Sequence, residues 1–356
     1  MKLLVGLALF VFLLGITPET VGLRRQNYKP YLIFTGIIIT LVMGLRTYRT
    51  GSPDTYQYMF RFSEMTQRSS FLPFFEEKLE EYEFLVSESG YYFYTFLLSR
   101  VFNDPQIFLL ISSAIITGCI CRFIYHNTSD APLALLIYIC LGLFTFNMNG
   151  LRQALAMSVC LVSYEFVKKR KLVYFVLTIL LAMQFHKTAI CFVPVYFLPM
   201  LEKGKGNIFL YFVCLIICLF SVDWFVETYN AFSGEEYVSE GSADGGGLSV
   251  ILIYIASIGL TLFKHKSLNK PHIRVTFYMV TAGFAAYVTR YFSNQILERI
   301  SYYYFFFTLL LVPNIFEELS EKERQLIRYI FCGAALALFA IRVSKGLFAN
   351  YKLFFQ

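Results

Sequence analysis

The chain contains 356 residues, of which 57% are apolar and 15% are charged, and its formal net charge is +7. Soluble domains carry about 25% charged residues, so the composition excludes an ordinary soluble protein. The sequence contains no basic run of the kind that binds nucleic acid, and we expect no nucleic-acid partner. Repeated apolar runs of roughly 20 residues instead indicate helices that cross a membrane.

The apolar runs predict an all-α fold, a polytopic integral membrane helical bundle that forms one domain over residues 1–356. We expect about 10 to 12 membrane segments, one or two of them broken or re-entrant. The first run is expected to be a retained helix and not a cleaved signal peptide, because no small-x-small site precedes Pro18. The runs lie at residues 3–17, 30–46, 91–102, 105–125, 131–148, 153–168, 172–200, 207–226, 248–264, 273–292, 296–316 and 325–342.

The positions of lysine and arginine predict the orientation, since short cytoplasmic loops are enriched in both. One arrangement places five basic clusters in the cytoplasm. It requires the run 172–200 to be a broken or hairpin pair, with His186 and Lys187 near its outer apex, and the run 91–102 to be re-entrant or to lie along the interface. In the alternative, both runs cross once and several basic clusters move outside. The clusters are Arg24/Arg25/Lys29, Lys168/Lys169/Arg170/Lys171, Lys203/Lys205, Lys264/Lys266/Lys270/Arg274 and Lys322/Arg324/Arg328.

The first arrangement puts two polar loops, 47–89 and 227–247, on the extracytoplasmic side. Between residues 74 and 89, glutamates are interleaved with apolar residues at spacings of three and four. This pattern predicts an amphipathic helix over the outer surface. The helix is either a solvated structural element or a lid over a site.

The stretch 44–58, which reads GLRTYRTGSPDTYQY, directly follows the second predicted span. Arg46, Arg49, Asp54 and Tyr58 therefore lie at a membrane boundary, where charged side chains are costly to desolvate and often functional. One interpretation is an anion-binding and catalytic mouth for a phosphate-bearing substrate. The other is that the arginines reach lipid headgroups while Ser-Pro-Asp forms an ordinary turn.

A second polar boundary, which reads NGLRQ at 149–153, joins two spans by a short turn. Arg152 and Gln153 begin the next helix, and a helix N-terminus favours anions through its free amides and its dipole. An arginine there adds a bidentate donor that lysine cannot replace. In the alternative interpretation, Arg152 only marks the membrane edge.

Two further polar groups interrupt apolar runs. His186, beside Lys187, can carry a proton or bind phosphate, or its ring can bond to neighbouring backbone. Arg290 ends one run, and Glu298 and Arg299 open the next. These charges either pair with one another, or Arg299 faces a substrate that Glu298 orients.

We expect neither a metal site nor a cofactor. The four histidines are scattered along the chain, and the eight cysteines lie almost entirely inside apolar runs. We interpret the cysteines as small buried apolar side chains.

Five motifs follow one another along nearly the whole chain: Gly44-x-Arg46, Gly51-x-x-Asp54-x-x-x-Tyr58, Asn149-Gly150-x-Arg152-Gln153-Ala154, Phe185-His186-Lys187-Thr188-Ala189 and Glu298-Arg299-Ile300. In this order and spacing they resemble the EpsG family, which looks like a branch of the Wzy-type bacterial polysaccharide polymerases. The resemblance implies a GT-C-like glycosyltransferase in the bacterial cell membrane, with its active site on the extracytoplasmic side. It would polymerise repeat units of exopolysaccharide, capsule or O-antigen carried on undecaprenyl diphosphate.

The resemblance and these residues together lead to a mechanistic hypothesis. A hydroxyl at the non-reducing end of one polyprenyl-diphosphate-linked oligosaccharide attacks the anomeric carbon of another, and polyprenyl diphosphate leaves. Asp54 or His186 would accept the proton. Fixed cations would stabilise the leaving diphosphate without a metal. The candidates for this clamp are Arg46, Arg49, Arg152, Lys187 and Arg299.

Other functions share parts of this machinery. A ligase would move the glycan to a different acceptor, and a flippase or exporter would move the lipid-linked oligosaccharide itself. A non-catalytic assembly subunit is the remaining alternative. The expected partners are the lipid-linked oligosaccharide, membrane lipid and, as a further candidate, a chain-length-regulator protein.

Overall fold

The computed structural model describes residues 1–20, 28–48, 53–73, 76, 88–201, 247–290, 296–346 and 348–355, together with positions 211–212, 215–216, 220–221, 224 and 227. The described chain is helical, as the apolar runs predict, and one isolated bridge joins Arg46 to Leu353. The elements are α1 (Lys2–Thr20), α2 (Tyr28–Gly44), α3 (Pro53–Gln67), α5 (Ser89–Ser99), α6 (Pro105–Asn127), α7 (Ala131–Cys140), α8 (Leu143–Asn149), α9 (Leu151–Lys168), α10 (Leu172–Met183), the 3₁₀ helices η2 (Lys187–Tyr196) and η3 (Leu198–Met200), α13 (Gly247–Phe263), η4 (His265–Asn269), α14 (Pro271–Thr289), α15 (Ile296–Phe305), α16 (Thr308–Phe316) and α17 (Glu321–Lys345).

Two described helices, α6 and α17, are long and apolar enough to cross a membrane by themselves. Two further pairs of helices are each bent at a short break: α7 and α8 by 55°, and α15 and α16 by 42°. If each bent pair is one span, the described residues contain four candidate spans. Shorter apolar helices include α2, α10 and the apolar part of α13. The structure is therefore that of a helical membrane protein, and the number of crossings stays a prediction.

The bend between α7 and α8 has a local cause. Gly142 has φ +91°, a left-handed conformation that side chains other than glycine rarely adopt. A Cβ atom there would also collide with the guanidinium of Arg342 on α17. Arg342 also donates from Nη2 to the hydroxyl of Thr145 on α8 at 3.0 Å.

The run 172–200 is a hairpin, as the orientation argument predicts. Helix α10 ends at Met183, and the chain reverses at residues 184–186 before η2 begins. The two ends of the run meet again, because Arg170 donates to the carbonyl of Pro199 at 3.0 Å. His186 and Lys187 therefore lie at the apex of this hairpin.

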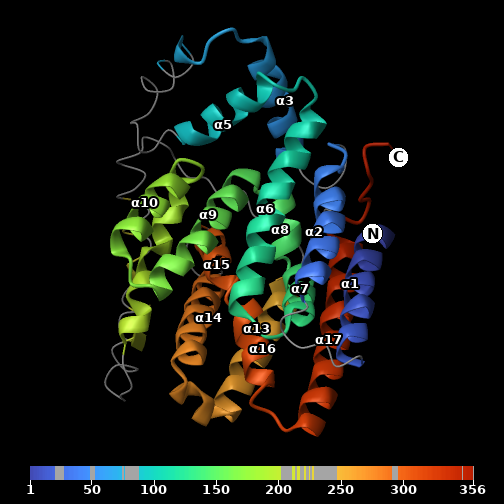
Figure 1. Cartoon of the computed structure of the whole chain (residues 1–356), viewed down its shortest axis with the longest axis vertical. Coiled ribbons are helices and arrows are strands. Elements are labelled where there is room, and N and C mark those ends of the chain that lie inside the picture. Colours follow the sequence, from blue (N-terminus) through green and yellow to red (C-terminus); the bar gives the residue numbers. More distant parts are fainter. Residues whose placement is uncertain are drawn as a thin grey trace.

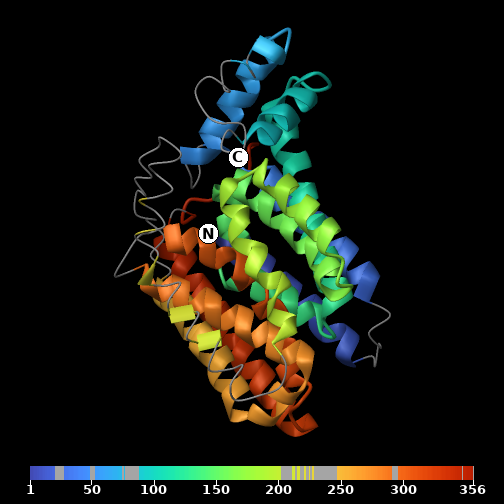
Figure 2. The ribbon, with the colours of Figure 1, turned by 90° about the vertical axis from the view of Figure 1, so that its left-hand side faces the viewer.

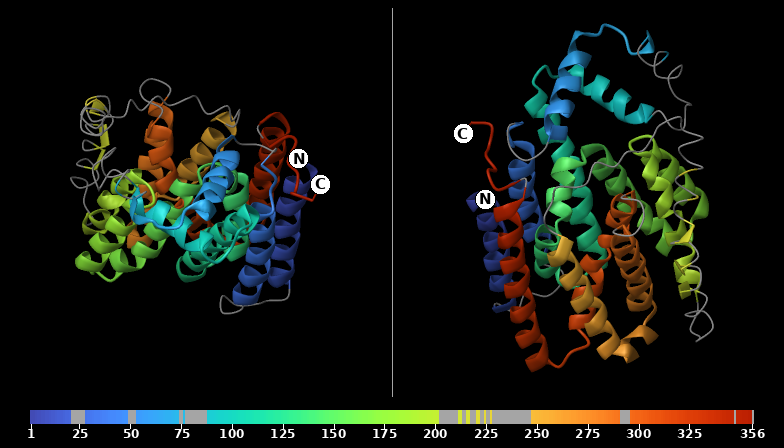
Figure 3. Two further views of the ribbon diagram at one scale, coloured as in Figure 1. Left: turned by 90° about the horizontal axis from the view of Figure 1, so that it is seen from above. Right: turned by 180° about the vertical axis from the view of Figure 1, so that it is seen from behind.

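Helices α3 and α5 lie over one end of the bundle (Figure 1), and Figure 2 and Figure 3 show the same end from other directions. Residues 53–67 of the predicted outer loop thus form a helix, α3, that begins at Pro53, a favourable first residue for a helix. Most of the amphipathic helix predicted over 74–89 lies outside the described residues, which include only 76, 88 and 89 of it. Most of the loop 227–247 lies outside them as well.

The opposite end of the bundle gathers the basic clusters. Lys168 at the end of α9 donates to Asn127 at the end of α6 at 2.6 Å. Arg328 pairs with Asp130 at 2.9 Å. Lys270 pairs with Glu318 at 2.6 Å, and Lys264 pairs with Glu323 at 3.6 Å. The described members of three clusters thus share one end of the bundle, while Lys203 and Lys205 lie outside the described residues.

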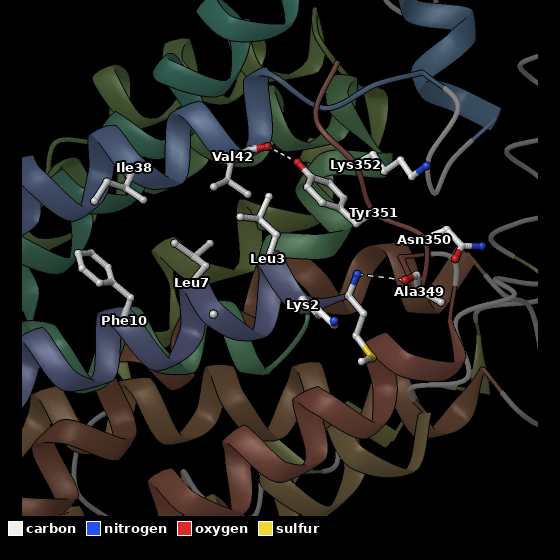
Figure 4. Close-up of a pocket in the computed structure, with 12 residues that line it drawn as sticks. Lys2, Leu3, Leu7, Phe10, Ile38, Val42, Ala349, Asn350, Tyr351 and Lys352 are labelled. Carbon is white, nitrogen blue, oxygen red and sulfur yellow. Dashed lines mark hydrogen bonds between the residues drawn. The ribbon is translucent and has the colours of Figure 1, made fainter. Parts of the chain in front are cut away.

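The two ends of the chain pack together beside α2. The amino group of Met1 donates to the carbonyl of Ala349 at 3.0 Å, and the Tyr351 hydroxyl hydrogen bonds to the carbonyl of Val42 (Figure 4). An apolar groove of about 860 Å³ lies between α1, α2 and this terminal segment. The segment continues to Phe354, whose amide donates to the carbonyl of Leu45 at 2.8 Å.

Candidate active site

Glu88 is the centre of a cluster at the end of the bundle that α3 and α5 cover. Its Oε2 accepts from Nη1 of Arg152 at 2.6 Å. Its Oε1 lies 3.1 Å from Nδ1 of His186 and 3.2 Å from the backbone nitrogen of Lys187. One carboxylate thus joins the start of α9 to the apex of the hairpin.

The backbone around Glu88 holds the carboxylate in this position. Glu88 itself has φ +49°, in the left-handed region. The next residues bind the apex: the Ser89 hydroxyl donates to Oε1 of Gln184 at 2.7 Å, and the Tyr91 amide donates to the Gln184 carbonyl at 2.9 Å. At Gly90 the two segments pack so closely that a Cβ would lie 2.5 Å from Cβ of Gln184.

The charges around Glu88 keep it ionised. Burial would raise the pKa of this carboxyl. The hydrogen bond from His186, the positive charge of Arg152 and the Lys187 amide outweigh that effect and lower its pKa to about 2. Glu88 is therefore a poor proton acceptor near neutral pH. It is suited to orienting the imidazole and the guanidinium that it contacts.

The cluster is open on the arginine side. The Glu88 side chain is 7% exposed and that of His186 8%, but 33% of the Arg152 side chain remains exposed. Arg152 also lies over the Tyr91 ring, with its guanidinium carbon 5.8 Å from the ring centroid. An anion that approaches this end of the bundle would therefore meet Arg152 first.

Tyr58 brings α3 into the same cluster. Its ring packs edge-on against Tyr91, with the centroids 6.3 Å apart, and its hydroxyl interacts electrostatically with Arg152, Asp54 and Arg299. Asp54 and Tyr58 are four residues apart on α3 and therefore share one face of that helix. His186 is likewise within electrostatic range of Arg152 and Arg299.

Gln153 positions Arg299 next to Arg152. The buried Gln153 side chain donates from Nε2 to the backbone carbonyl of Arg299 at 2.6 Å. This bond joins the first turn of α9 to the first turn of α15. The N-termini of α9 and α15, each of which carries an arginine, are therefore adjacent. The Arg299 side chain is exposed.

Arg290 and Glu298 form a different kind of contact. They make a buried ion pair in which each side chain is 9% exposed. The Tyr302 hydroxyl donates to Oε1 of Glu298 at 3.1 Å, and Arg290 lies over the ring of Tyr287, 3.9 Å from its centroid. This pair connects the end of α14 to the start of α15.

Arg46 is buried, with 1% of its surface exposed. Its guanidinium donates to the carbonyl of Met43 at 2.5 Å, the carbonyl of Met148 at 2.9 Å and the hydroxyl of Thr55 at 3.2 Å. These bonds join the end of α2 to the ends of α8 and α3. Arg46 thus supports the backbone beside Arg152, and Arg49 lies outside the described residues.

Comparison with protein-family models matches residues 29–353 to the EpsG family. The chain belongs to the EpsG family. EpsG is a Wzy-like family of polysaccharide polymerases, and this membership implies a membrane enzyme that acts on a lipid-linked oligosaccharide. The comparisons with curated proteins and with solved structures gave no match.

The EpsG-family motifs converge only in part on one cluster. The structure brings Arg152, Gln153, Arg299, His186 and Lys187 together, with Asp54 and Tyr58 beside them on α3. The Arg290–Glu298 pair and the buried Arg46 are not bonded to Glu88 in the structure; they bond to each other or to backbone and hydroxyl groups nearby. Within the described part of the chain, no three His, Cys, Asp or Glu side chains lie close enough to bind a metal ion.

Sequence reasoning missed the role of Glu88. It counted this residue as one of six acidic residues on a predicted amphipathic helix. The available signal was its position, because Glu88 stands just before the apolar run 91–102, as Arg46 stands at the end of the run 30–46. No local pattern shows that its carboxylate contacts His186.

Proposed function

We propose that this EpsG-family protein polymerises polyprenyl-diphosphate-linked repeat units on the outer face of the bacterial inner membrane. The observation that carries the proposal is the pairing of Glu88 with both Arg152 and His186. It puts a group that can accept a proton beside a group that can bind a diphosphate. Glycosyl transfer from a lipid diphosphate requires both.

In the proposed reaction, His186 is the general base that takes the proton of the acceptor hydroxyl during its attack. Its Nδ1 faces Glu88, which leaves Nε2 to accept the proton of an acceptor hydroxyl. A carboxylate that fixes the tautomer of a histidine in this way makes the imidazole a better-oriented base. Asp54, in the first turn of α3, is the alternative base.

The bonds exchanged in the reaction balance without a further reactant. The acceptor oxygen forms a bond to the anomeric carbon of the donor sugar as the bond from that carbon to the diphosphate oxygen breaks. The electron pair leaves with the polyprenyl diphosphate, and the acceptor proton goes to the base. A single displacement predicts inversion at the anomeric carbon.

The leaving diphosphate would bind at the N-termini of α9 and α15. Free amides and helix dipoles favour anions there, and Arg152 and Arg299 add two guanidiniums. Charge on the diphosphate grows during bond breaking, so these donors stabilise the transition state more than the ground state. Lys187 is a third candidate cation for this cradle. Arg46 supports it through its bonds to the backbone.

The proposed side of the membrane follows from α9. Arg152 is at its first turn and Lys168 at its last, about 24 Å apart at 1.5 Å per residue, close to the thickness of a bilayer core. Lys168 belongs to the end that gathers the basic clusters. The tendency of such clusters to remain in the cytoplasm supports an extracytoplasmic site. The proposal that the fold is of the GT-C kind rests on the family resemblance.

The proposal is tested with a strain that lacks the gene. Lipid-linked glycans extracted from that strain should contain single repeat units on lipid, and the wild-type gene should restore a ladder of polymer. Long glycan that stays on lipid would indicate a ligase. Repeat units that accumulate only on the cytoplasmic face would indicate a flippase. A ladder unchanged by deletion would overturn the proposal.

A further inference from the structure

A groove of about 820 Å³ lies between α2 and α6 on the outside of the bundle. Its walls are almost wholly apolar and include Gly36 and Gly118. At one end the helices close on each other, because a Cβ on Gly44 would lie 2.7 Å from Cα of Leu110. Farther along, the groove is open, since a Cβ on Gly118 would meet no atom within 4 Å.

The other end of the groove is basic. Lys29 at the start of α2 and Arg122 and His126 at the end of α6 line it, and all three side chains are exposed. In the described part of the chain, no acidic residue pairs with any of them. Three potential cations that converge without acidic partners favour an anionic ligand.

This groove is separate from the candidate active site. Asn127, which directly follows the basic end, contacts Lys168 at the end of α9. Arg152 is at the opposite end of α9. The groove is therefore basic at the end of the bundle that lies away from the Glu88 cluster, so the diphosphate cradle does not explain it.

We propose that the groove binds an anionic phospholipid, with its phosphate between Lys29 and Arg122 and one acyl chain along Gly36 and Gly118. The lining from Leu110 to His126 spans about 24 Å of helix at 1.5 Å per residue, which is long enough for an acyl chain. Basic pockets between membrane helices bind anionic headgroups in this way. On the orientation proposed above, the lipid comes from the cytoplasmic leaflet.

The test counts bound lipids by native mass spectrometry. The purified full-length protein is titrated in detergent with dioleoylphosphatidylglycerol, and with dioleoylphosphatidylcholine as the neutral lipid. Phosphatidylglycerol should bind more tightly. Each surface charge changes such binding roughly fivefold, so Lys29→Gln/Arg122→Gln should weaken it about 30-fold. The control, Lys169→Gln/Lys322→Gln, removes the same charge from exposed positions outside the groove. It should leave the binding of phosphatidylglycerol unchanged.

A second variant tests the acyl-chain part of the groove with all the charges kept. A Cβ at Gly118 meets no atom within 4 Å, so Gly118→Phe places its ring in the groove. It should reduce binding of phosphatidylglycerol at least tenfold while thermal stability is maintained. Equal binding of the two lipids, or equal loss in both double variants, would overturn the proposal. A co-purified polyprenyl lipid or a second copy of the chain in the groove would also overturn it.

Discussion

The Nδ1 atom of His186 lies 3.1 Å from Oε1 of Glu88, although one residue is at the apex of a hairpin and the other at the start of α5. The same carboxylate binds Arg152 at 2.6 Å through its other oxygen. A change at Glu88 therefore alters a proton acceptor and an anion-binding group together. Several predictions about the reaction depend on this arrangement.

Replacement of Glu88 should abolish most activity without removing the protein from the membrane. Glu88→Gln keeps the shape but loses the charge that orients His186 and Arg152, and polymer formation should fall at least about 100-fold. The measurement is the ladder of lipid-linked glycan at matched protein amounts. Glu64→Gln, at an exposed position on α3, is the control and should give a normal ladder.

The two candidate bases can be separated by mutation. If His186 accepts the proton, His186→Gln should lower the rate by about 100-fold to 10,000-fold, whereas Asp54→Asn should have a much smaller effect. The rates are measured with purified protein and lipid-linked repeat units. The reverse order would assign the base to Asp54.

The guanidinium of Arg152 should not be replaceable by an ammonium group. Arg152→Lys keeps the positive charge but cannot bond to Glu88 and a diphosphate in the same plane, and we expect a loss of roughly ten- to hundred-fold. Arg68→Lys, at an exposed position after α3, is the matched control. Full polymer length from Arg152→Lys would contradict bidentate binding.

The Arg290–Glu298 pair should be structural and non-additive. Arg290→Met leaves a buried carboxylate without its partner and should reduce the free energy of unfolding by about 3–5 kcal/mol. Arg290→Met/Glu298→Leu removes both charges, and most of the lost free energy of unfolding should be recovered. Thermal unfolding in detergent measures both changes. Two independent, additive losses would show that the pair is not coupled.

Stability should depend on the ionisation of Glu88. Its pKa is about 2 in the folded protein against an ordinary value of 4.5. A lowered pKa stabilises the folded state above pH 4.5, and this contribution disappears as the pH falls toward 2. The difference in unfolding free energy between wild type and Glu88→Gln, up to about 3 kcal/mol at pH 7, should shrink at pH 3. A constant difference would exclude the lowered pKa.

The sequence by itself determined the class of the protein. The length and spacing of its apolar runs predict membrane helices because every backbone polar group must be satisfied inside lipid. The interruption at 184–187 predicted a broken or hairpin pair, and the structure has a hairpin there. Polar side chains are costly in the hydrocarbon region and therefore favour a turn between two helices. The ordered motifs, such as Arg152-Gln153 and His186-Lys187, were sufficient for the family.

Only the tertiary structure decided which charges act together. Arg46, Arg152 and Arg299 look alike in sequence, each at the end of an apolar run. In the fold Arg46 is buried against carbonyl groups, whereas Arg152 and Arg299 meet through Gln153. Contacts between residues far apart in the chain depend on how the helices pack, and no local pattern records them. For that reason Glu88, which joins Arg152 to His186, was found only in the folded chain.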